Sequence, residues 1–156
     1  MTVTVAVESP LQDELRELVA RLNDHLQPLS PPEFQFQLTA EQMAGEDTTV
    51  FVVRNGRSVA VGMGALKVHS PAIGEVKRMY TTPEVRGSGL GWLILQSIEA
   101  EARRRELGRL VLETGSTAGF EAAWRLYERS GFTRCGAVLD YPDSDYSRFY
   151  EKKLSP

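Results

Sequence analysis

A glycine-rich turn, Arg86-Gly87-Ser88-Gly89-Leu90-Gly91, is the segment whose residue types and spacing most clearly indicate chemistry. It lies between a predicted strand and a predicted helix, where glycines let the backbone curl and direct several N–H groups toward one point. The positive end of the helix dipole falls at the same place, which suits a phosphate group. A simple tight turn is the alternative interpretation of these three glycines.

Two familiar phosphate loops do not fit this turn. A Walker loop continues with Gly-Lys-Ser/Thr, whereas this chain continues with Gly91-Trp92-Leu93. A dinucleotide fingerprint ends on a small residue, but counted from Gly87 its last position is Trp92. The link over residues 81–85 is also too long for the tight turn of that fingerprint. A nicotinamide oxidoreductase is therefore a poor fit.

The composition argues against several other classes of function. The formal net charge is −3, from 21 acidic and 18 basic side chains, so no basic surface for nucleic acid is expected. His25 and His69 stand far apart with no second ligand at metal spacing, so no metal is expected. No apolar run approaches the ~20 residues of a membrane span, and no signal peptide is visible. With Cys135 as its single cysteine, the protein is expected to be cytoplasmic and free of membrane partners.

Apolar periodicity predicts the elements that must position the turn. Alternation indicates strands over residues 2–7, 48–53, 58–68, 73–81, 110–112, 132–135 and 147–154, with a hairpin turn at Asn55-Gly56. Helical spacing indicates helices over residues 11–23, 89–106 and 120–130, the first after a Ser9-Pro10 cap, and a capping box at Thr39 opens a short further helix. Gly62 and Gly64 indicate a bulge or the close approach of another backbone. We predict one mixed α/β domain over residues 1–156.

Several ordered segments resemble one protein family. The spacing Arg-x-x-Gly-x-Gly, met by Arg86, Gly89 and Gly91, resembles the acyl-CoA pyrophosphate loop of GNAT acetyltransferases. Further segments of this chain resemble other elements of that family in the correct order, namely residues 75–83, 112–115, 123–132 and 150–154. The resemblance implies the GNAT fold, a central mixed β-sheet of about seven strands flanked by about four helices. It also implies an N-acetyltransferase that moves an acetyl group from acetyl-CoA to a primary amine.

The resemblance implies where acetyl-CoA binds. Backbone N–H groups of Arg86, Gly87, Ser88, Gly89, Leu90 and Gly91 would hold the pyrophosphate, while the Arg86 side chain is either a further contact or a solvated surface group. The strand ending near Thr81 would splay from the strand over residues 110–113, so that main-chain groups of Met79, Tyr80 and Thr81 pair with the pantetheine arm. One N–H group there would polarise the thioester carbonyl. Phe120 stands where relatives often carry Asn or Gln, so this position offers no polar side chain.

The resemblance also implies catalytic roles for direct attack in a ternary complex. Tyr127 is the candidate general acid for the leaving thiolate, and its alternative is core packing on the apolar face of its helix. Glu75 is the candidate base that removes the proton of the amine, with Glu113 as the second choice; either could instead be a charged strand residue. Cys135 has no histidine nearby in sequence, so an acyl-enzyme is not expected.

The acceptor is expected to be a small, soluble primary amine rather than nucleic acid or a large basic protein surface. Asp140, Asp143 and Asp145 either lie near the mouth of the acceptor site or form a solvated turn. Residues 24–47 should help to wall this site but carry no recognisable motif. A homodimer is compatible with the sequence. A GNAT-fold module that holds CoA without chemistry is the alternative function, which turnover of acetyl-CoA with an amine would distinguish.

Overall fold

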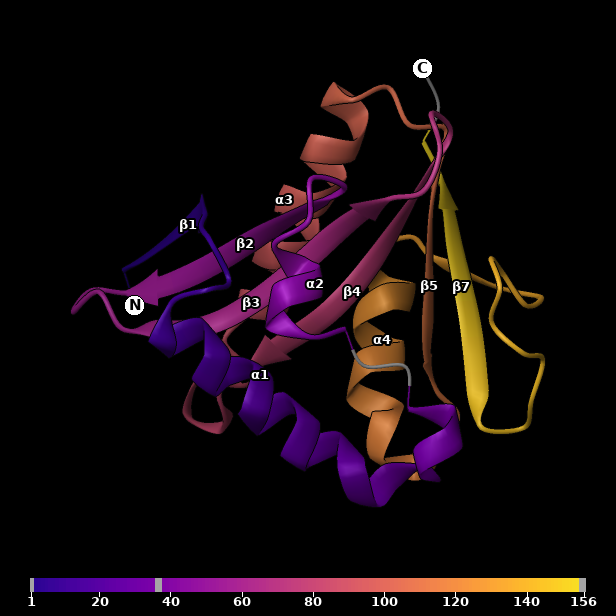
Figure 1. Ribbon diagram of the computed structural model, residues 1–156, viewed down its shortest axis with the longest axis horizontal. Coiled ribbons are helices and arrows are strands. Elements are labelled where there is room, and N and C mark those ends of the chain that lie inside the picture. The colour runs from indigo at the N-terminus through magenta and orange to yellow at the C-terminus, as the bar shows by residue number, and fades with distance from the viewer. Residues whose placement is uncertain (1, 36–37, 155–156) are drawn as a thin grey trace.

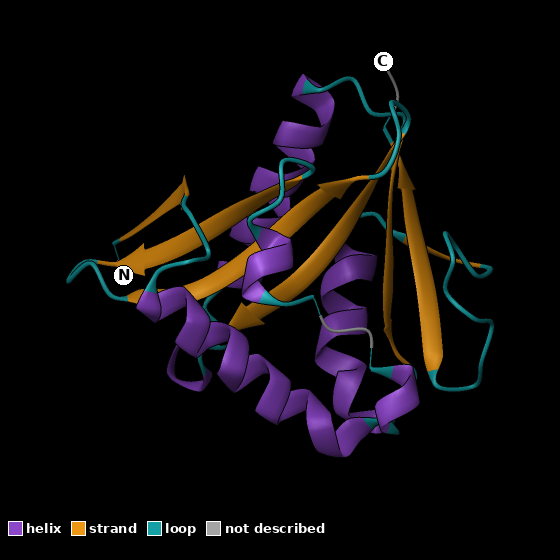
Figure 2. Cartoon of the chain, in the orientation of Figure 1, coloured by secondary structure: helices purple, strands orange, loops and turns teal. Residues whose placement is uncertain are grey.

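The computed structural model describes residues 2–35 and 38–154 and is built on a central seven-stranded sheet (Figures 1 and 2). The strands run in the order β1-β2-β3-β4-β5-β7-β6, and β4–β5 is the parallel pair among otherwise antiparallel neighbours. Their bounds are β1 Val3–Val7, β2 Thr48–Asn55, β3 Ala60–Val68, β4 Ile73–Thr81, β5 Arg109–Gly115, β6 Thr133–Cys135 and β7 Ser147–Lys153. The predicted mixed sheet is confirmed.

Helices cover both faces of this sheet, as Figure 1 shows. On one face lie α1, Asp13–Leu26, and the short α2, Ala40–Met43, above a core that includes Leu15, Met43 and Met63. On the other face lie α3, Leu90–Arg104, and α4, Glu121–Arg129, over a core that includes Ile94 and Leu112. None of the helices within the described residues combines the length and apolar character that crossing a bilayer requires.

The predicted Ser9-Pro10 cap is wrong, because α1 begins four residues after Ser9. The hydroxyl oxygen of Ser9 accepts a hydrogen bond from the N–H of Leu11 at 3.1 Å, so it closes a local turn. Gln12 instead occupies the N-cap position, without a capping side-chain bond. The capping box at Thr39, in contrast, is confirmed: Thr39 and Gln42 bond each other's backbone N–H groups at the start of α2.

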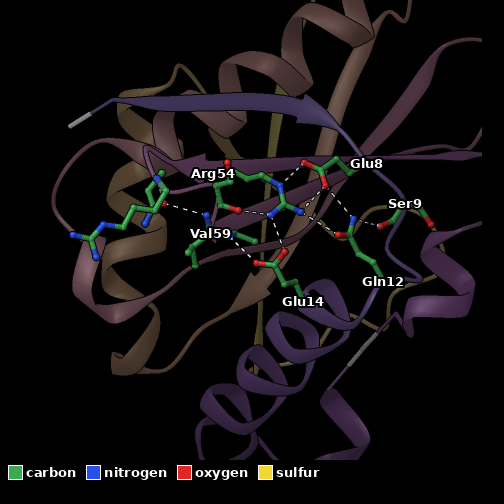
Figure 3. Close-up of polar contacts among 10 residues, drawn as sticks. Glu8, Ser9, Gln12, Glu14, Arg54 and Val59 are labelled. Carbon is green, nitrogen blue, oxygen red and sulfur yellow. Dashed lines mark hydrogen bonds and ion pairs between the residues drawn. The ribbon is translucent and has the colours of Figure 1, made fainter.

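An arginine on β2 fixes the start of α1 against the sheet, as Figure 3 shows. The Nε of Arg54 donates to Glu8 at 2.9 Å and one Nη donates to Glu14 at 2.7 Å, while the other Nη reaches Gln12 at 3.0 Å. The second carboxylate oxygen of Glu14 accepts from the N–H of Ala60, which begins β3. Hydrogen bonds from Arg54 lower the pKa of both carboxyl groups. The cluster therefore joins β2, β3 and the first turn of α1.

A bulge interrupts the β3–β4 ladder between Met63 and Ala65. The extra residue lies on β4, where Arg78 takes a positive φ of 55°. Gly64 lies opposite, and a Cβ added to it would come 2.5 Å from Ile94 Cγ2 and 2.6 Å from Met79 Sδ. Of the two predicted alternatives the bulge is thus confirmed, and the atoms that approach Gly64 are side-chain atoms of α3 and β4, which pack directly on the backbone of β3.

The parallel pairing of β4 and β5 is very short. It joins Ile73, Gly74 and Glu75 to residues 109–111 and then stops. Beyond this point β4 pairs with β3 up to Thr81, and β5 pairs with β7 up to Gly115. The two strands therefore diverge like the arms of a V, with α4 behind the opening in Figure 1.

We expect Gly64→Ala to lower the free energy of unfolding by about 1–3 kcal/mol, because its methyl group has no room beside Ile94. Gly56→Ala is the matched control, since its nearest neighbour, the carbonyl oxygen of Thr2, lies 3.8 Å from the added Cβ. The control should change stability by less than about 0.5 kcal/mol. Urea denaturation of both variants measures the difference. Equal unfolding midpoints would show that the protein accommodates a methyl group at Gly64 without loss of stability.

Candidate active site

A cleft of about 670 Å³ lies at the opening between β4 and β5. Its walls come from residues 75–81 of β4, residues 113–115 of β5, the turn and first residues of α3, one side of α4, and the segment at the end of α1. The volume is in the range that holds a small molecule or a cofactor arm. The splayed strands thus provide a site that reaches through the sheet.

The glycine-rich turn is built to present backbone N–H groups to this cleft. Gly87 and Gly89 have φ values of 84° and 85°, and a Cβ at either position would meet nothing within 4 Å. Helix α3 begins at Leu90 with no side chain bonded to its first N–H groups, and its first backbone bond runs from Leu93 to Gly89 at 3.1 Å. Uncapped N–H groups and the helix dipole together favour an anion here.

The side chains of the turn hold its shape. The Arg86 guanidinium lies over the Tyr80 ring, 5.5 Å from its centroid, and its Nε donates to the carbonyl of Thr81 at 3.2 Å. The Ser88 hydroxyl donates to the carbonyl of Val85, and Leu90 is buried. Arg86 is an exposed residue, but these two contacts hold its guanidinium group in place. It ties the turn to the end of β4.

A close contact links the turn to helix α4. A Cβ at Gly91 would lie 3.1 Å from Leu126 Cδ2 on α4, so glycine at this position allows the two helices to approach. Leu126 precedes Tyr127, which lines the cleft. The glycine-rich turn thus contacts the residue next to the candidate acid.

On β4, Met79, Tyr80 and Thr81 line the cleft with a free strand edge beside them. Met79 packs against the α3 side of the sheet, whereas Tyr80 belongs to the core under α1. Since β5 pairs with β4 no further than Glu75, the β5-facing edge of β4 has unpaired main-chain groups. An extended ligand arm can add to such an edge as a strand does.

Tyr127 is packed in the core and also lines the cleft, so its position is compatible with both roles considered for it. It is 7% exposed, with the Phe132 and Tyr150 rings at centroid distances of 6.0 and 5.9 Å. Its hydroxyl has no hydrogen-bond partner among the described residues. Burial, together with the nearby charge of Glu113, raises the pKa of this phenol, so Tyr127 keeps its proton at neutral pH.

Glu75 is the centre of a polar cluster on the α1 side of the sheet. One carboxylate oxygen lies 2.8 Å from His69 Nε2, and the other accepts a hydrogen bond from the Tyr141 hydroxyl. Lys77 Nζ lies 3.4 Å from that second oxygen and 2.6 Å from the Tyr141 oxygen. Glu75 is 2% exposed while the His69 side chain is 27% exposed. The cluster therefore connects a buried carboxylate in the cleft with the surface.

His69 and Tyr141 were missed by the sequence reasoning. His69 follows β3 closely and Glu75 lies near the start of β4, so a β3–β4 hairpin model would have brought the two together. Tyr141 comes from the long connection between β6 and β7, and no local pattern places it near β4. Only the structure shows where its hydroxyl lies.

Glu113 faces the cleft from β5. Its carboxylate accepts a hydrogen bond from the Ser147 hydroxyl at 2.7 Å. Burial raises the pKa of Glu113, the Ser147 hydrogen bond and the positive charge of Lys77 oppose the rise, and the charge of Glu75 adds to it. Both carboxylates considered as bases therefore line one cleft, from opposite arms of the V.

The remaining candidates have other surroundings. Phe120 lies directly against Gly115 at the end of β5, so this position gives the cleft an apolar wall. Cys135 lies on β6 outside the cleft lining, and burial raises the pKa of its thiol. Asp140, Asp143 and Asp145 are exposed and lie outside the lining, to which their loop contributes Tyr141 instead.

The segment after α1 closes one end of the cleft. Short 3₁₀ turns over residues 27–29 and 32–34 follow the helix, and Leu22, His25 and Phe34 contribute to the lining. Burial and the charge of Arg86 lower the pKa of His25, so its imidazole is neutral at pH 7. This segment includes much of the expected acceptor wall; residues 36–37 of that stretch lie outside the described residues.

Comparison with known proteins gives this site a context. A sequence model described as the acetyltransferase (GNAT) family matches residues 13–132. The chain is 39% identical over 153 residues to the IAA acetyltransferase of Azospirillum brasilense, covering 97% of this chain and 98% of the relative. It is also 39% identical over 142 residues to the uncharacterized N-acetyltransferase YsnE of Bacillus subtilis, covering 89% and 93%.

Solved structures share the fold. A Klebsiella pneumoniae protein assigned as an acyl-CoA N-acyltransferase superimposes with a TM-score of 0.83 at 31% identity, covering 99% of each chain. The PaiA N-acetyltransferase of Thermoplasma acidophilum has the same fold, with a TM-score of 0.78 at 16% identity over 99% of this chain and 100% of the other. The splayed strands, the uncapped helix and these matches have one explanation: the chain belongs to the GNAT family of acetyltransferases.

Proposed function

We propose that this protein transfers an acetyl group from acetyl-CoA to the primary amine of a small molecule, by direct attack in a ternary complex. The observation that carries the proposal is a single cleft that joins an uncapped helix N-terminus to a free strand edge and two carboxylates. Residues 1–156 would act as one catalytic domain. The PaiA relative in fold was solved with coenzyme A, which supports the choice of donor.

The residues present fit acetyl-CoA. The N–H groups of Gly87, Gly89, Leu90 and Gly91 would hold the pyrophosphate, because the space in front of Gly87 and Gly89 is open and the start of α3 carries no capping side chain. The N–H groups of Arg86 and Ser88 donate within the turn, to the carbonyls of Pro83 and Val85 at 3.3 Å. Main-chain groups of Met79, Tyr80 and Thr81 would pair with the pantetheine arm along the edge that β5 leaves free. Acetyl-CoA then supplies an acetyl thioester next to the carboxylates of the cleft.

The chain's own side chains would manage the two protons of the transfer. Glu75 accepts a proton from the ammonium form of the acceptor, directly or through water, which leaves a lone pair on nitrogen. As the new C–N bond forms and the C–S bond breaks, Tyr127 donates its proton to the leaving sulfur and regains one from solvent. A backbone N–H near Met79 stabilises the negative charge on the carbonyl oxygen. The buried, protonated phenol supports this assignment of the acid.

The shape of the cleft supports a small acceptor. Its acceptor end is closed by the segment after α1, where the Phe34 ring stacks on Tyr146 at 5.0 Å and the Thr117 hydroxyl donates to the carbonyl of Leu29 at 2.9 Å. A folded protein surface would have to displace these contacts to reach Glu75. A small amine can enter the 670 Å³ cleft as it stands.

The donor site is tested by Gly89→Glu, which places a carboxylate where the pyrophosphate should bind. In the unaltered protein, acetyl-CoA at 100 times its Kd should add about 2.7 kcal/mol to the free energy of unfolding. The variant should fold and lose this stabilisation, as measured by thermal shift. Gly136→Glu adds the same charge at a position with open space outside the cleft, and should keep it. An undiminished shift in Gly89→Glu would remove the turn from the donor site.

Tyr127→Phe tests the general acid. We expect kcat to fall roughly 10- to 1,000-fold with little change in acetyl-CoA affinity, because the ring stays and only the proton donor is lost. Tyr150→Phe is the matched control, since this buried ring packs on Tyr127 but its hydroxyl donates to Glu128 at 2.6 Å. If Tyr127→Phe turned over normally and melted early, Tyr127 would be a packing residue.

Glu75→Gln and Glu113→Gln decide between the two candidate bases. Loss of the base should lower kcat/KM about 100-fold near pH 7 and restore it as the pH rises toward the pKa of the amine, because free amine then needs no base. We expect this pH-dependent recovery for Glu75→Gln, and a small, pH-independent effect for Glu113→Gln. The opposite pattern in the two pH profiles would assign the base to Glu113, whose raised pKa would suit that role.

A further inference from the structure

Arg78 is a buried cation that lines the cleft and has no counter-ion within residues 2–35 and 38–154. Its residue is 8% exposed, and its Nη2 donates to the side-chain carbonyl of Asn23 on α1. Its Nε is buried without a hydrogen-bond partner, and among the described residues no carboxylate forms an ion pair with it. Burial lowers the pKa of Arg78 to about 10, so the guanidinium remains charged at neutral pH.

Such an arrangement is unfavourable unless a ligand completes it. A charge taken out of water is costly when no opposite charge or full set of hydrogen bonds replaces the water. Arg54 illustrates the usual solution in this fold, since Glu8 and Glu14 both pair with it. Arg78 has a single neutral partner among the described residues, Asn23, and the residue belongs to the cleft lining. An anion that enters the cleft would supply the missing partner.

The backbone holds Arg78 in this place at some cost. Its positive φ of 55° is rarely adopted by residues other than glycine, asparagine and aspartate, and such strain is concentrated at functional sites. The bulge lets Arg78 reach α1 through Asn23, while its neighbour Met79 packs on the opposite, α3 side of the sheet. Arg78 thus lies on the acceptor side of the strand, next to the main chain proposed to hold the thioester.

We infer that the acceptor is an amino carboxylate, an amino-acid-like molecule whose carboxylate pairs with Arg78 while its ammonium group faces Glu75. The inference rests on the proposed function and adds the class of substrate. The two charges of such a molecule match two charges on one strand: Glu75 and Arg78 are three residues apart on β4, about 10 Å at the usual rise per residue. The bidentate fork of arginine is suited to a carboxylate.

The phosphates of the donor are a weaker explanation for the same charge. The pyrophosphate has its own site at the turn over Arg86–Gly91, which begins beyond the end of β4. Arg78 precedes Thr81, the last residue of β4, and reaches toward α1 rather than toward the start of α3. If Arg78 served the donor, its loss would weaken acetyl-CoA binding and leave the choice of acceptor unchanged.

The test compares L-amino acids with the carboxamides of the same amino acids as acceptors, in a thiol-release assay with acetyl-CoA. We expect kcat/KM to be about 10- to 100-fold higher for the best amino acid than for its amide, as for one charge-assisted pair. The amide has the less basic amine and so the larger fraction of free amine at pH 7.5, which biases the comparison against this outcome. If the amides were used with a kcat/KM equal to or higher than that of the amino acids, the inference would be overturned and the proposed function would still stand.

Variants assign the preference to Arg78. In Arg78→Met the amino acid and its amide should be used equally, whereas Arg78→Lys should keep part of the preference because it keeps the charge. Arg125→Met is the control, since Arg125 is an exposed arginine that lines the same cleft from α4. It should leave the preference intact. An unchanged preference in Arg78→Met, or weaker acetyl-CoA binding as its only effect, would place the anion site elsewhere.

A binding measurement makes the test independent of turnover. With CoA saturating, calorimetric titration with the amino acids should give heat in the unaltered protein, and affinity should fall at least about 10-fold in Arg78→Met. Because this variant removes an unpaired buried charge, its melting temperature should not fall by more than a few degrees. Failure of every amine to react while amino acids still bind through Arg78 would refute the proposed chemistry alone. Absence of binding to both proteins would refute the inference.

Discussion

The separation of β4 from β5 is the constraint on which the rest of the site depends. Three paired residues hold the strands together at one end, and beyond Glu75 neither strand completes the other's ladder. An unpaired strand edge inside a domain is unfavourable unless a ligand or another segment covers it. The sheet therefore carries an opening that reaches from the start of α3 to the end of α1. Tyr127, both candidate carboxylates and most of the glycine-rich turn line it, whereas Ser88 does not.

Much of the fold could be predicted from local patterns, because most elements are amphipathic. The helical spacing around Ile94 and Ile98 buries one face of α3, as expected. The alternation predicted for β3 is wrong, because that strand is buried on both faces, with Val61 in the core under α3 and Met63 in the core under α1. The glycine turn was found because positive φ angles and an open helix start need glycine. The start of α1 was misplaced because its first turn is fixed by Arg54, 40 residues beyond Glu14 in sequence.

The acid–base cluster and the buried arginine could not be derived from sequence patterns. Tyr141 reaches Glu75 from 66 residues away, out of an irregular connection with no periodicity. Arg78 belongs to a strand in which alternation would assign it to the face opposite Lys77, and only the bulge redirects it toward α1. One extra residue in a strand moves every later side chain to the other face of the sheet. A prediction that assumes strict alternation therefore assigns those residues to the wrong face.

The contacts that hold the segment after α1 affect which substitutions the protein can accept during evolution. Among the contacts of this wall with the rest of the protein are Phe34 on Tyr146 and Thr117 on Leu29, whereas the turn at Gly91 packs against Leu126 of α4. Substitutions in this wall would reshape the proposed acceptor end of the cleft and leave the glycine-rich turn in place. Under the proposed function, selection for a new recipient molecule would act on one short stretch of chain, with the elements that deliver the acetyl group inherited intact.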